Sequence, residues 1–233
     1  MKYYELISNF CNNLNLKFNE DIYRKIITYT NELISYNNKF NLTAITDEET
    51  IIKRHFLDSF CFYYNNIENN SNVCDVGTGA GFPGMAIKIL RDDINIDLIE
   101  VSTKKVEFLK HITSTLDLKN INIIRERVEN VSHETFYREK YDYVTSRAVS
   151  KLDKLLELSF ALVKLNGKFI GFKGINFYNE LIDSIKVINL MGGEFKESIY
   201  LKEFTSSLIV IKKIKHTPSI YPREYKKILK KSL

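Results

Sequence analysis

Glycine is scarce in this chain, and almost half of the glycines lie in one short stretch. Four of the nine glycines, with one of the three prolines, fall within Asp75–Gly84, which reads DVGTGAGFPG. An apolar run, Val73–Val76, precedes this stretch, and helical spacing follows it in Met85–Leu90. Because glycine has no Cβ, such a loop can turn sharply and let the backbone approach a ligand closely. A glycine-rich loop between a strand and a helix is typical of α/β folds that bind a nucleotide-like cofactor.

Beyond this loop the chain keeps alternating between strand and helix patterns. Further strands are expected at Ile94–Val101, Ile121–Arg125, Tyr141–Thr145, Gly167–Phe172, Glu194–Leu201 and Ser207–Ile214. Helices are expected at Lys104–Leu116, after a capping Ser150, and at Phe177–Leu190. Alternating units predict a parallel sheet, and the last two strands, which no helix separates, predict an antiparallel end. The predicted fold class is therefore α/β, with a Rossmann-like, mostly parallel seven-stranded sheet and an antiparallel last strand.

The first part of the chain carries helical rather than strand patterns. Its apolar side chains recur at helical spacing at Ile22, Ile26, Tyr29, Leu33 and Ile34. A second helix is expected to begin with a capping box formed by Thr46 and Glu49. We predict three segments, which are an N-terminal helical extension over residues 1–70, the Rossmann-like domain over residues 71–215, and a basic C-terminal tail over residues 216–233.

Charge is distributed unevenly along the chain. Residues 212–233 hold eight lysines and arginines and one glutamate, a net charge of +7. The other residues hold 26 basic and 28 acidic side chains, a net charge of −2, so residues 212–233 carry the whole positive excess of +5. Tyr221, Arg223 and Tyr225 lie among these lysines. Basic side chains interleaved with aromatic ones favour the binding of nucleic-acid phosphates.

Composition excludes several classes of protein. No apolar run approaches the length of a membrane span, about 18 residues, and no secretory signal is visible at the amino terminus. The three cysteines, Cys11, Cys61 and Cys74, are far apart and form no CxxC pair, so neither a disulfide framework nor a zinc site is indicated. We therefore expect a cytoplasmic protein that needs no metal and no membrane, with a monomer as the default state.

Glu100 stands at the end of the strand that follows the glycine loop, where an acid can accept the hydroxyl protons of a ribose. Two kinds of cofactor fit this geometry. From Gly79 onward the loop matches GxGxxG, the pattern of NAD(P)-dependent oxidoreductases. From Asp75 onward it has the form D-x-G-x-G-x-G, which resembles motif I of the class I methyltransferases that bind S-adenosylmethionine. The second match is preferred, and the oxidoreductase remains an alternative.

Motifs outside the loop extend this resemblance to one family. NLT at residues 41–43, RHFLDS at 54–59, GTGAGFPG at 77–84, SRAV at 146–149, FKG at 172–174 and YPR at 221–223 occur in this order. The set resembles the bacterial small-subunit ribosomal RNA guanine-N7 methyltransferases, also called glucose-inhibited division protein B. This resemblance implies methylation of 16S rRNA, or of the small ribosomal subunit, at the guanine conventionally numbered 527. The tail departs from the family, which usually has glycines and prolines after YPR, whereas none follows Pro222 here.

The resemblance also implies roles for individual residues. Those expected to bind the cofactor are Gly77, Gly79, Phe82, Glu100 at the ribose, Val128 and Glu129 at the adenine, and Arg147. Arg147 is also the expected catalytic residue, because it follows the fourth strand directly and faces the crevice at the carboxyl ends of the strands. The residues expected to face the RNA are Arg54, His55, Lys173 and Arg223. The plain alternative for Arg54 is a solvated ion pair with Asp58, four residues further on.

The lack of other catalytic motifs favours a ring nitrogen as methyl acceptor. Guanine N7 has a lone pair in the ring plane, so no residue has to remove a proton, and positioning and electrostatics suffice. No cysteine lies near the fourth strand to attack an aromatic carbon, and SRAV lacks the Asn/Asp-Pro-Pro-aromatic form used for exocyclic amines. Methylation of a ribose 2′-hydroxyl and a non-catalytic RNA-binding protein of the same fold remain as alternatives.

Overall fold

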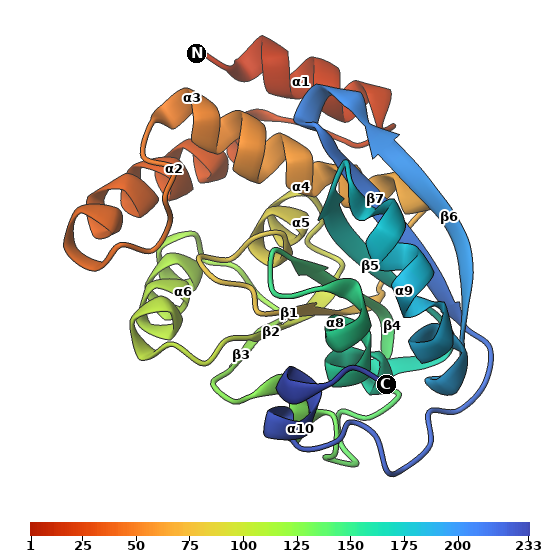
Figure 1. The fold of residues 1–233 in the computed structure, drawn as a ribbon. Helices are drawn as coiled ribbons and strands as arrows, with labels where there is room; N and C mark the ends of the chain where they lie inside the picture. Colours follow the sequence, from red (N-terminus) through yellow and green to blue (C-terminus); the bar gives the residue numbers. More distant parts are fainter.

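The computed structural model describes all 233 residues and contains one seven-stranded sheet (Figure 1). The strands are β1 Asn72–Val76, β2 Asn95–Ile99, β3 Ile121–Ile124, β4 Tyr141–Arg147, β5 Val163–Gly174, β6 Gly193–Leu201 and β7 Ser206–Lys213. Their order is β3-β2-β1-β4-β5-β7-β6, in which β1 to β5 are parallel and β7 is antiparallel to both of its neighbours. The predicted sheet is confirmed, including its antiparallel end.

Helices cover both faces of the sheet. They are α1 Tyr4–Asn13, α2 Glu20–Phe40, α3 Glu48–Thr50, α4 Asp58–Phe60, α5 Gly84–Leu90, α6 Thr103–Thr115, α7 Val128–Val131, α8 Leu152–Ser159, α9 Phe177–Leu190 and α10 Tyr225–Lys230. One hydrophobic cluster joins α2, α5 and α6 to the sheet, and a second joins α7, α8 and α9 to it. In β1, Val73 belongs to the first cluster and Cys74 to the second, because successive side chains of a strand point to opposite faces. None of the helices combines the length and apolar composition that crossing a membrane requires.

The amino-terminal helices share their core with the sheet. The first hydrophobic cluster crosses the expected boundary at residue 70 and takes side chains from both sides of it. Tyr29 in α2 is fully buried, and its ring packs against Phe82 and Phe108. Its hydroxyl donates a 2.5 Å hydrogen bond to the carbonyl of Ala80 in the glycine loop. The extension therefore supports the loop directly.

Two predicted helix caps are wrong by one residue. Asp47, not Thr46, caps α3, and its carboxylate accepts a 2.9 Å hydrogen bond from the Thr50 amide. At α8 the capping position is Lys151, and no side chain caps the helix, so Ser150 does not act as predicted. A capping side chain reaches only the amides two or three positions ahead, so one residue of displacement removes the bond.

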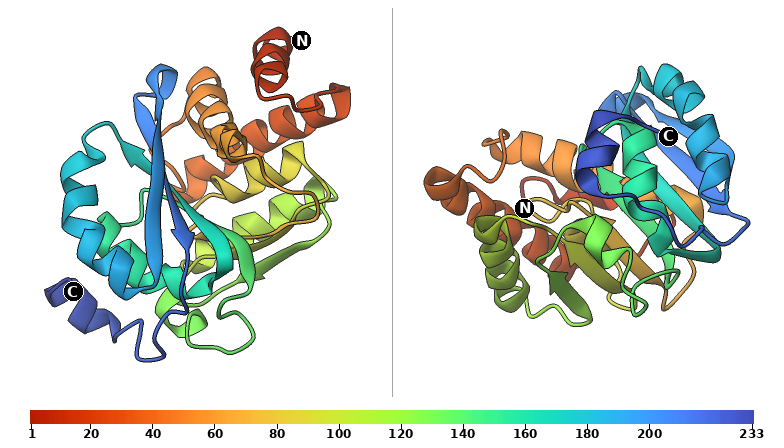
Figure 2. Two further views of the ribbon diagram at one scale, coloured as in Figure 1. Left: turned by 90° about the vertical axis from the view of Figure 1, so that its right-hand side faces the viewer. Right: turned by 60° about the horizontal axis from the view of Figure 1, so that its bottom comes forward.

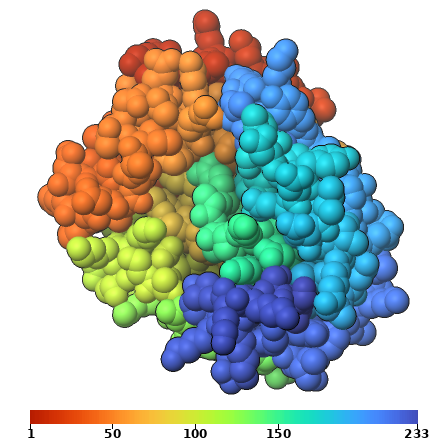
Figure 3. Space-filling model, viewed as in Figure 1, coloured from red at the N-terminus to blue at the C-terminus, as the bar shows by residue number.

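The basic tail ends in a short helix, α10, which lies beside α8 (Figures 1 and 2). In the space-filling view the tail, in dark blue, sits directly against the green surface of the preceding segments (Figure 3). Arg138 donates hydrogen bonds to three tail carbonyls between residues 217 and 221. Arg223 donates from two of its nitrogens to the carboxylate of Glu157 in α8. Specific contacts therefore dock the tail onto the domain.

Candidate active site

The glycine loop leaves β1 and crosses the carboxyl end of the sheet. The amides of Gly77 and Thr78 donate to the carbonyl of Ile99, at the end of β2, with N···O distances of 2.9 and 3.2 Å. Gly77, Gly79 and Gly81 have φ angles of +67°, +63° and +97°, which other residues adopt only with strain. A Cβ on Gly79 would meet nothing closer than 3.9 Å, so backbone conformation rather than lack of space requires glycine there. The loop thus presents bare backbone to a ligand.

Asp75 is fully buried beneath the loop and fastens it. One carboxylate oxygen accepts hydrogen bonds from the Thr78 hydroxyl at 2.6 Å and from the Gly84 amide at 2.8 Å. The other oxygen, Oδ1, has no hydrogen-bond partner. Burial raises the pKa of the Asp75 carboxyl group to about 6. The group is therefore mostly ionised at neutral pH and adds negative charge under the loop.

Glu100 follows β2 directly and is almost completely buried. Its two carboxylate oxygens accept hydrogen bonds from the amides of Gly79 at 3.0 Å and Ser102 at 2.9 Å. Each carboxylate oxygen can accept more than one hydrogen bond, so both keep capacity for the hydroxyls of a ribose. Backbone amides on two sides hold this acceptor in a fixed orientation.

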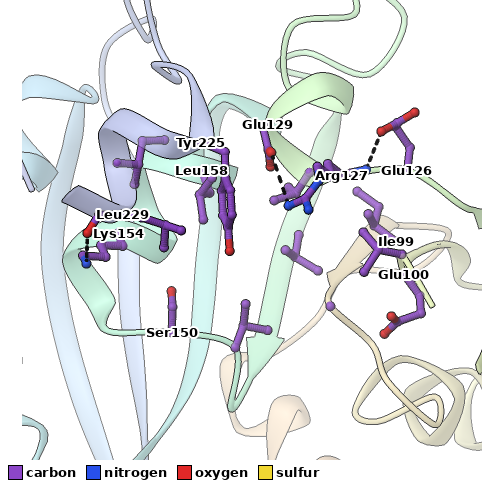
Figure 4. A pocket seen from close by; sticks show the side chains of 16 residues that line it. Ile99, Glu100, Glu126, Arg127, Glu129, Ser150, Lys154, Leu158, Tyr225 and Leu229 are labelled. Atoms are coloured by element: carbon purple, nitrogen blue, oxygen red, sulfur yellow. Dashed lines mark hydrogen bonds and ion pairs between the residues drawn. The ribbon is translucent and has the colours of Figure 1, made fainter. Parts of the chain in front are cut away.

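A largely apolar hollow lies beyond Glu100, beneath α10, and is called the tail cavity here (Figure 4). Its lining residues are Val76, Gly77, Ile99, Glu100, Val101, Glu126, Arg127, Val128, Glu129, Val149, Ser150, Lys154, Leu158, Tyr225, Ile228 and Leu229. Four of the seven residues predicted to bind the cofactor are among them, namely Gly77, Glu100, Val128 and Glu129. Apolar walls with a few polar groups suit a nucleoside.

A second hollow, the loop cleft, lies along the glycine loop. Its lining residues are Leu42, Thr43, His55, Gly77, Thr78, Gly79, Ala80, Phe82, Lys105, Arg147 and Ala148. The three other predicted cofactor residues, Gly79, Phe82 and Arg147, lie here. Gly77 lines both the tail cavity and the loop cleft, so the two hollows meet at the loop. The structure thus brings all seven predicted residues to one edge of the sheet.

Arg147, the last residue of β4, is held by the amino-terminal helices. Its guanidinium donates 3.0 Å hydrogen bonds to the Asp58 carboxylate and the Arg54 carbonyl, and a 3.1 Å bond to Nδ1 of His55. The same group lies 5.6 Å from the centre of the Phe82 ring. The side chain is still 15% exposed, which leaves part of the guanidinium accessible from the cleft.

His55 acts as a neutral acceptor in this network. Its Nδ1 accepts from Arg147, so we assign the proton to Nε2, which then donates to the Thr43 hydroxyl at 3.1 Å. Its ring stacks on Phe82 with the centroids 4.7 Å apart. Burial, followed by the nearby Arg147 charge, lowers the pKa of His55 to about 3. The imidazole therefore stays uncharged at neutral pH.

The ion pair between Arg54 and Asp58, the alternative given in the sequence analysis, does not form. The helix widens to a π-helix over Ile51–Leu57, which ends directly before Asp58. Asp58 pairs with Arg147 instead, and Arg54 donates to the carbonyl of Phe204. Asp58 therefore orients an arginine from another element of the fold.

A third hollow, the arginine groove, adjoins the loop cleft. Its lining residues are Arg54, Asp58, Arg147, Ala148, Phe172, Lys173, Gly174, Phe204, Thr205 and Ser206. Arg147 and Ala148 line both the loop cleft and the arginine groove. The tail cavity, the loop cleft and the arginine groove therefore form one continuous path along the carboxyl edge of the sheet.

All four residues expected to face RNA bind partners within the protein, and those of Arg54 and His55 are given above. The Lys173 ammonium contacts Glu180 at 2.8 Å and the Ser150 carbonyl at 2.7 Å, and its side chain is 10% exposed. Arg223 donates to Glu157 at 2.7 and 2.8 Å, and Glu157 is almost completely buried. Both residues therefore have a structural role in the folded chain, and their contact with RNA stays a prediction. Lys173 braces the segment before α8, and Arg223 anchors the tail.

The donor set of the site fits S-adenosylmethionine better than a pyrophosphate cofactor. The amides of Gly77 and Thr78, which could cradle a phosphate, already bind the Ile99 carbonyl. The buried carboxylates of Asp75 and Glu100 lie next to the loop, where they favour the positive sulfonium and ammonium groups and oppose a pyrophosphate. No three metal-ligating side chains converge anywhere in the structure.

Comparison with known families decides the assignment. The family model GidB, described as rRNA small subunit methyltransferase G, matches residues 22–182. The chain belongs to the GidB family. A GidB-family relative, "Ribosomal RNA small subunit methyltransferase G" of Clostridium perfringens (strain 13 / Type A), is 38% identical over 238 residues and is matched over 100% of both chains. The protein of that name from Clostridium kluyveri is 39% identical over 227 residues, which cover 96% of each chain.

Solved structures share the fold of this GidB-family chain at low sequence identity. A SAM dependent methyltransferase from Aquifex aeolicus superposes with a TM-score of 0.56 at 14% identity, covering 71% of this chain and 93% of that chain. The ribosomal protein L11 methylase of Lactobacillus delbrueckii subsp. bulgaricus gives 0.54 at 11% identity, covering 73% and 81%. The predicted class I methyltransferase fold, family and cofactor class are confirmed, and the oxidoreductase alternative is set aside.

Several residues that the structure places in the site were not predicted to belong to it. Thr43 and Lys105 line the loop cleft, Asp58 orients Arg147, and Tyr225 lines the tail cavity. Lys105 had a usable signal, because it lies in the first turn of the helix after β2, at the edge of the sheet where ligands bind. Tyr225 had none, since only the path of the tail brings it there.

Proposed function

We propose that this chain transfers the methyl group of S-adenosylmethionine to N7 of a guanine in 16S rRNA. Membership of the GidB family supports the enzyme class and the RNA. The observation that carries the site is the continuous path from the tail cavity through the loop cleft to the arginine groove. Buried carboxylates lie at its cofactor end and arginines at its far end, as a cationic cofactor and an anionic substrate require.

The cofactor would lie across the glycine loop, with its nucleoside in the tail cavity. Glu100 would accept the ribose hydroxyls, and Val128 and Glu129 would contact the adenine. Gly77 and Gly79 allow close approach, because their backbone carries no Cβ. When bound, S-adenosylmethionine supplies a methyl group activated by its sulfonium.

The target guanine would enter from the arginine groove and meet Arg147. Guanine presents O6 and N7 as neighbouring acceptors, so a guanidinium bound to O6 positions the base and leaves N7 free. No residue has to remove a proton, because N7 attacks with an existing lone pair. The Arg147–Asp58 ion pair supplies donors with little net charge, which avoids repelling the purine as it becomes positive. Arg54 lines the same groove and is the second proposed RNA contact.

The test is a methyl-transfer assay with labelled S-adenosylmethionine and two substrates, free 16S rRNA and small ribosomal subunits. Mass spectrometry should place the label on N7 of the expected guanine. Arg147→Ala should lower the rate at least about 100-fold. Arg24→Ala, which removes a 72% exposed arginine of α2, is the matched control and should keep the wild-type rate. A label on another atom, or full activity of Arg147→Ala, would contradict the proposal.

A further inference from the structure

The tail helix α10 forms one wall of the tail cavity, although it comes from the most basic segment of the chain. Tyr225, Ile228 and Leu229 line the cavity together with Glu100 and Val128. Ile228 is fully buried, while the lysines of α10 are exposed. The helix is therefore amphipathic, and its apolar face is directed at the space beside Glu100.

Glu100 indicates which part of the cofactor this wall faces. An acid at the end of β2 accepts the ribose hydroxyls, so the base lies beyond it, over the end of β3. Glu126, Arg127 and Glu129 mark that end of the cavity. Figure 4 shows Tyr225 reaching from α10 toward the cavity, with Arg127 and Glu129 on the opposite side.

Contacts between α10 and the opposite wall of the tail cavity are present in the structure. The Arg127 guanidinium lies 4.7 Å from the centre of the Tyr225 ring, so α10 touches the wall next to α7. Lys154 in α8 donates a 2.8 Å hydrogen bond to the Leu229 carbonyl, drawn in Figure 4. Together with the Arg223–Glu157 ion pair, these bonds hold α10 over the cavity.

We propose that α10 is the lid of the adenine end of the cofactor site, with Tyr225 packing against the adenine base. Aromatic rings stack on the flat face of a purine base, and this contact excludes water from that face. The lid rests on the proposed function, because it takes S-adenosylmethionine as the ligand. No residue of α10 belongs to either hydrophobic cluster, so the helix can release and reclose without breaking the main core while Arg223 stays bound to the buried Glu157.

The first test is the affinity for S-adenosylmethionine of full-length Tyr225→Ala, measured by titration calorimetry without RNA. Loss of the ring should weaken binding about tenfold or more, the range found for base stacking. Tyr225→Phe keeps the ring and should stay within about twofold of wild type. S-adenosylhomocysteine, which carries the same adenine, should lose affinity by the same factor. Tyr178→Ala, at a 67% exposed tyrosine of α9 outside the three hollows, is the matched control.

A second readout is tryptic cleavage after the lysines of α10. S-adenosylmethionine should slow this cleavage in the wild type and should protect Tyr225→Ala much less, while circular dichroism shows that the variant is folded. The proposal that α10 is a lid would be overturned by either of two results. One is an unchanged affinity of Tyr225→Ala for S-adenosylmethionine, and the other is tryptic cleavage of the wild type that the cofactor does not slow. A wild-type chain that binds no S-adenosylmethionine would overturn the proposed function instead.

Discussion

Arg147 shows how strongly one functional side chain depends on residues from elsewhere in the chain. Asp58 balances its charge, and neutral His55 accepts a hydrogen bond that a protonated imidazole would not accept. Phe82 lies beneath both Arg147 and His55. A guanidinium fixed on three sides loses little further freedom when a base binds, which favours precise positioning.

A pH titration tests whether His55 is neutral in the folded protein. Folding lowers its pKa from 6.5 to about 3, so between these values the unfolded chain binds more protons at His55 than the folded one. The contribution of His55 to stability is therefore present above pH 6.5 and is lost as the pH falls toward 3. Denaturant unfolding at several pH values should show that the free energy of unfolding falls less on acidification for His55→Gln than for wild type. Equal losses would contradict this prediction.

Gly79 is predicted to tolerate only very small side chains. At φ +63° a β-branched residue is strained by about 1–2 kcal/mol. Gly79→Val should therefore abolish methyl transfer and weaken S-adenosylmethionine binding, and Gly79→Ala should do so less. Calorimetry and the transfer assay measure both effects. Gly174→Ala is the control for affinity, because a Cβ there meets nothing within 4 Å and should leave cofactor binding unchanged. A near-wild-type rate for Gly79→Val would refute the assignment of the loop.

Among the elements, the tail has side chains that face the protein and side chains that face solvent. Arg223 and Ile228 face inward, where they anchor α10 and line the tail cavity. Lys226, Lys230 and Lys231 are exposed. The inward residues dock the helix, and the outward lysines form a basic surface that we expect to contact RNA phosphates.

Removing the outward charge should weaken RNA binding without weakening cofactor binding. Lys230→Ala combined with Lys231→Ala should lower affinity for a 16S rRNA fragment and reduce the slope of log K against log salt by up to about 1.5–2. Filter binding at several salt concentrations measures this slope. The double change Lys119→Ala with Lys196→Ala, on other surfaces, is the matched control. An unchanged slope would show that the tail lysines do not contact RNA.

At the scale of the whole molecule, the amino-terminal helices and the sheet build the site together. The loop cleft takes Thr43 and His55 from the extension and Gly79 and Arg147 from the sheet edge. One hydrophobic cluster runs through both parts. Because the two parts share a core, the extension helps to set the shape of the cofactor site.

The Tyr29 hydroxyl is the most direct test of this coupling. Tyr29→Phe leaves the buried Ala80 carbonyl without its donor, which should cost about 1–3 kcal/mol of unfolding free energy and loosen the glycine loop. Thermal unfolding and S-adenosylmethionine titration should both show a loss. Tyr36→Phe, in the same helix and packed on the same Phe108, is the matched control. Full cofactor affinity in Tyr29→Phe would show that the loop does not depend on the extension.

Local patterns were sufficient for the fold and for the position of Glu100 at the end of β2. Apolar strands alternating with helices predict the parallel sheet, and a glycine loop followed by an acid at the end of the next strand predicts where Glu100 lies. These features depend on neighbours within one βαβ unit. Ends of helices were less predictable, as Thr46 and Ser150 show, because a shift of one residue changes which side chain reaches the free amides.

The sheet, the glycine loop, the position of Glu100 and the family follow from the amino-acid sequence, because each depends on residues close together in the chain or on motifs in a set order. The partners of the charged side chains, in contrast, follow from the three-dimensional packing of the chain. Asp58 meets Arg147 across 89 positions, and Glu157 meets Arg223 across 66. No periodicity or spacing encodes such pairs. A charge binds the opposite charge that folding places beside it, and that distance is set by the packing of the whole chain.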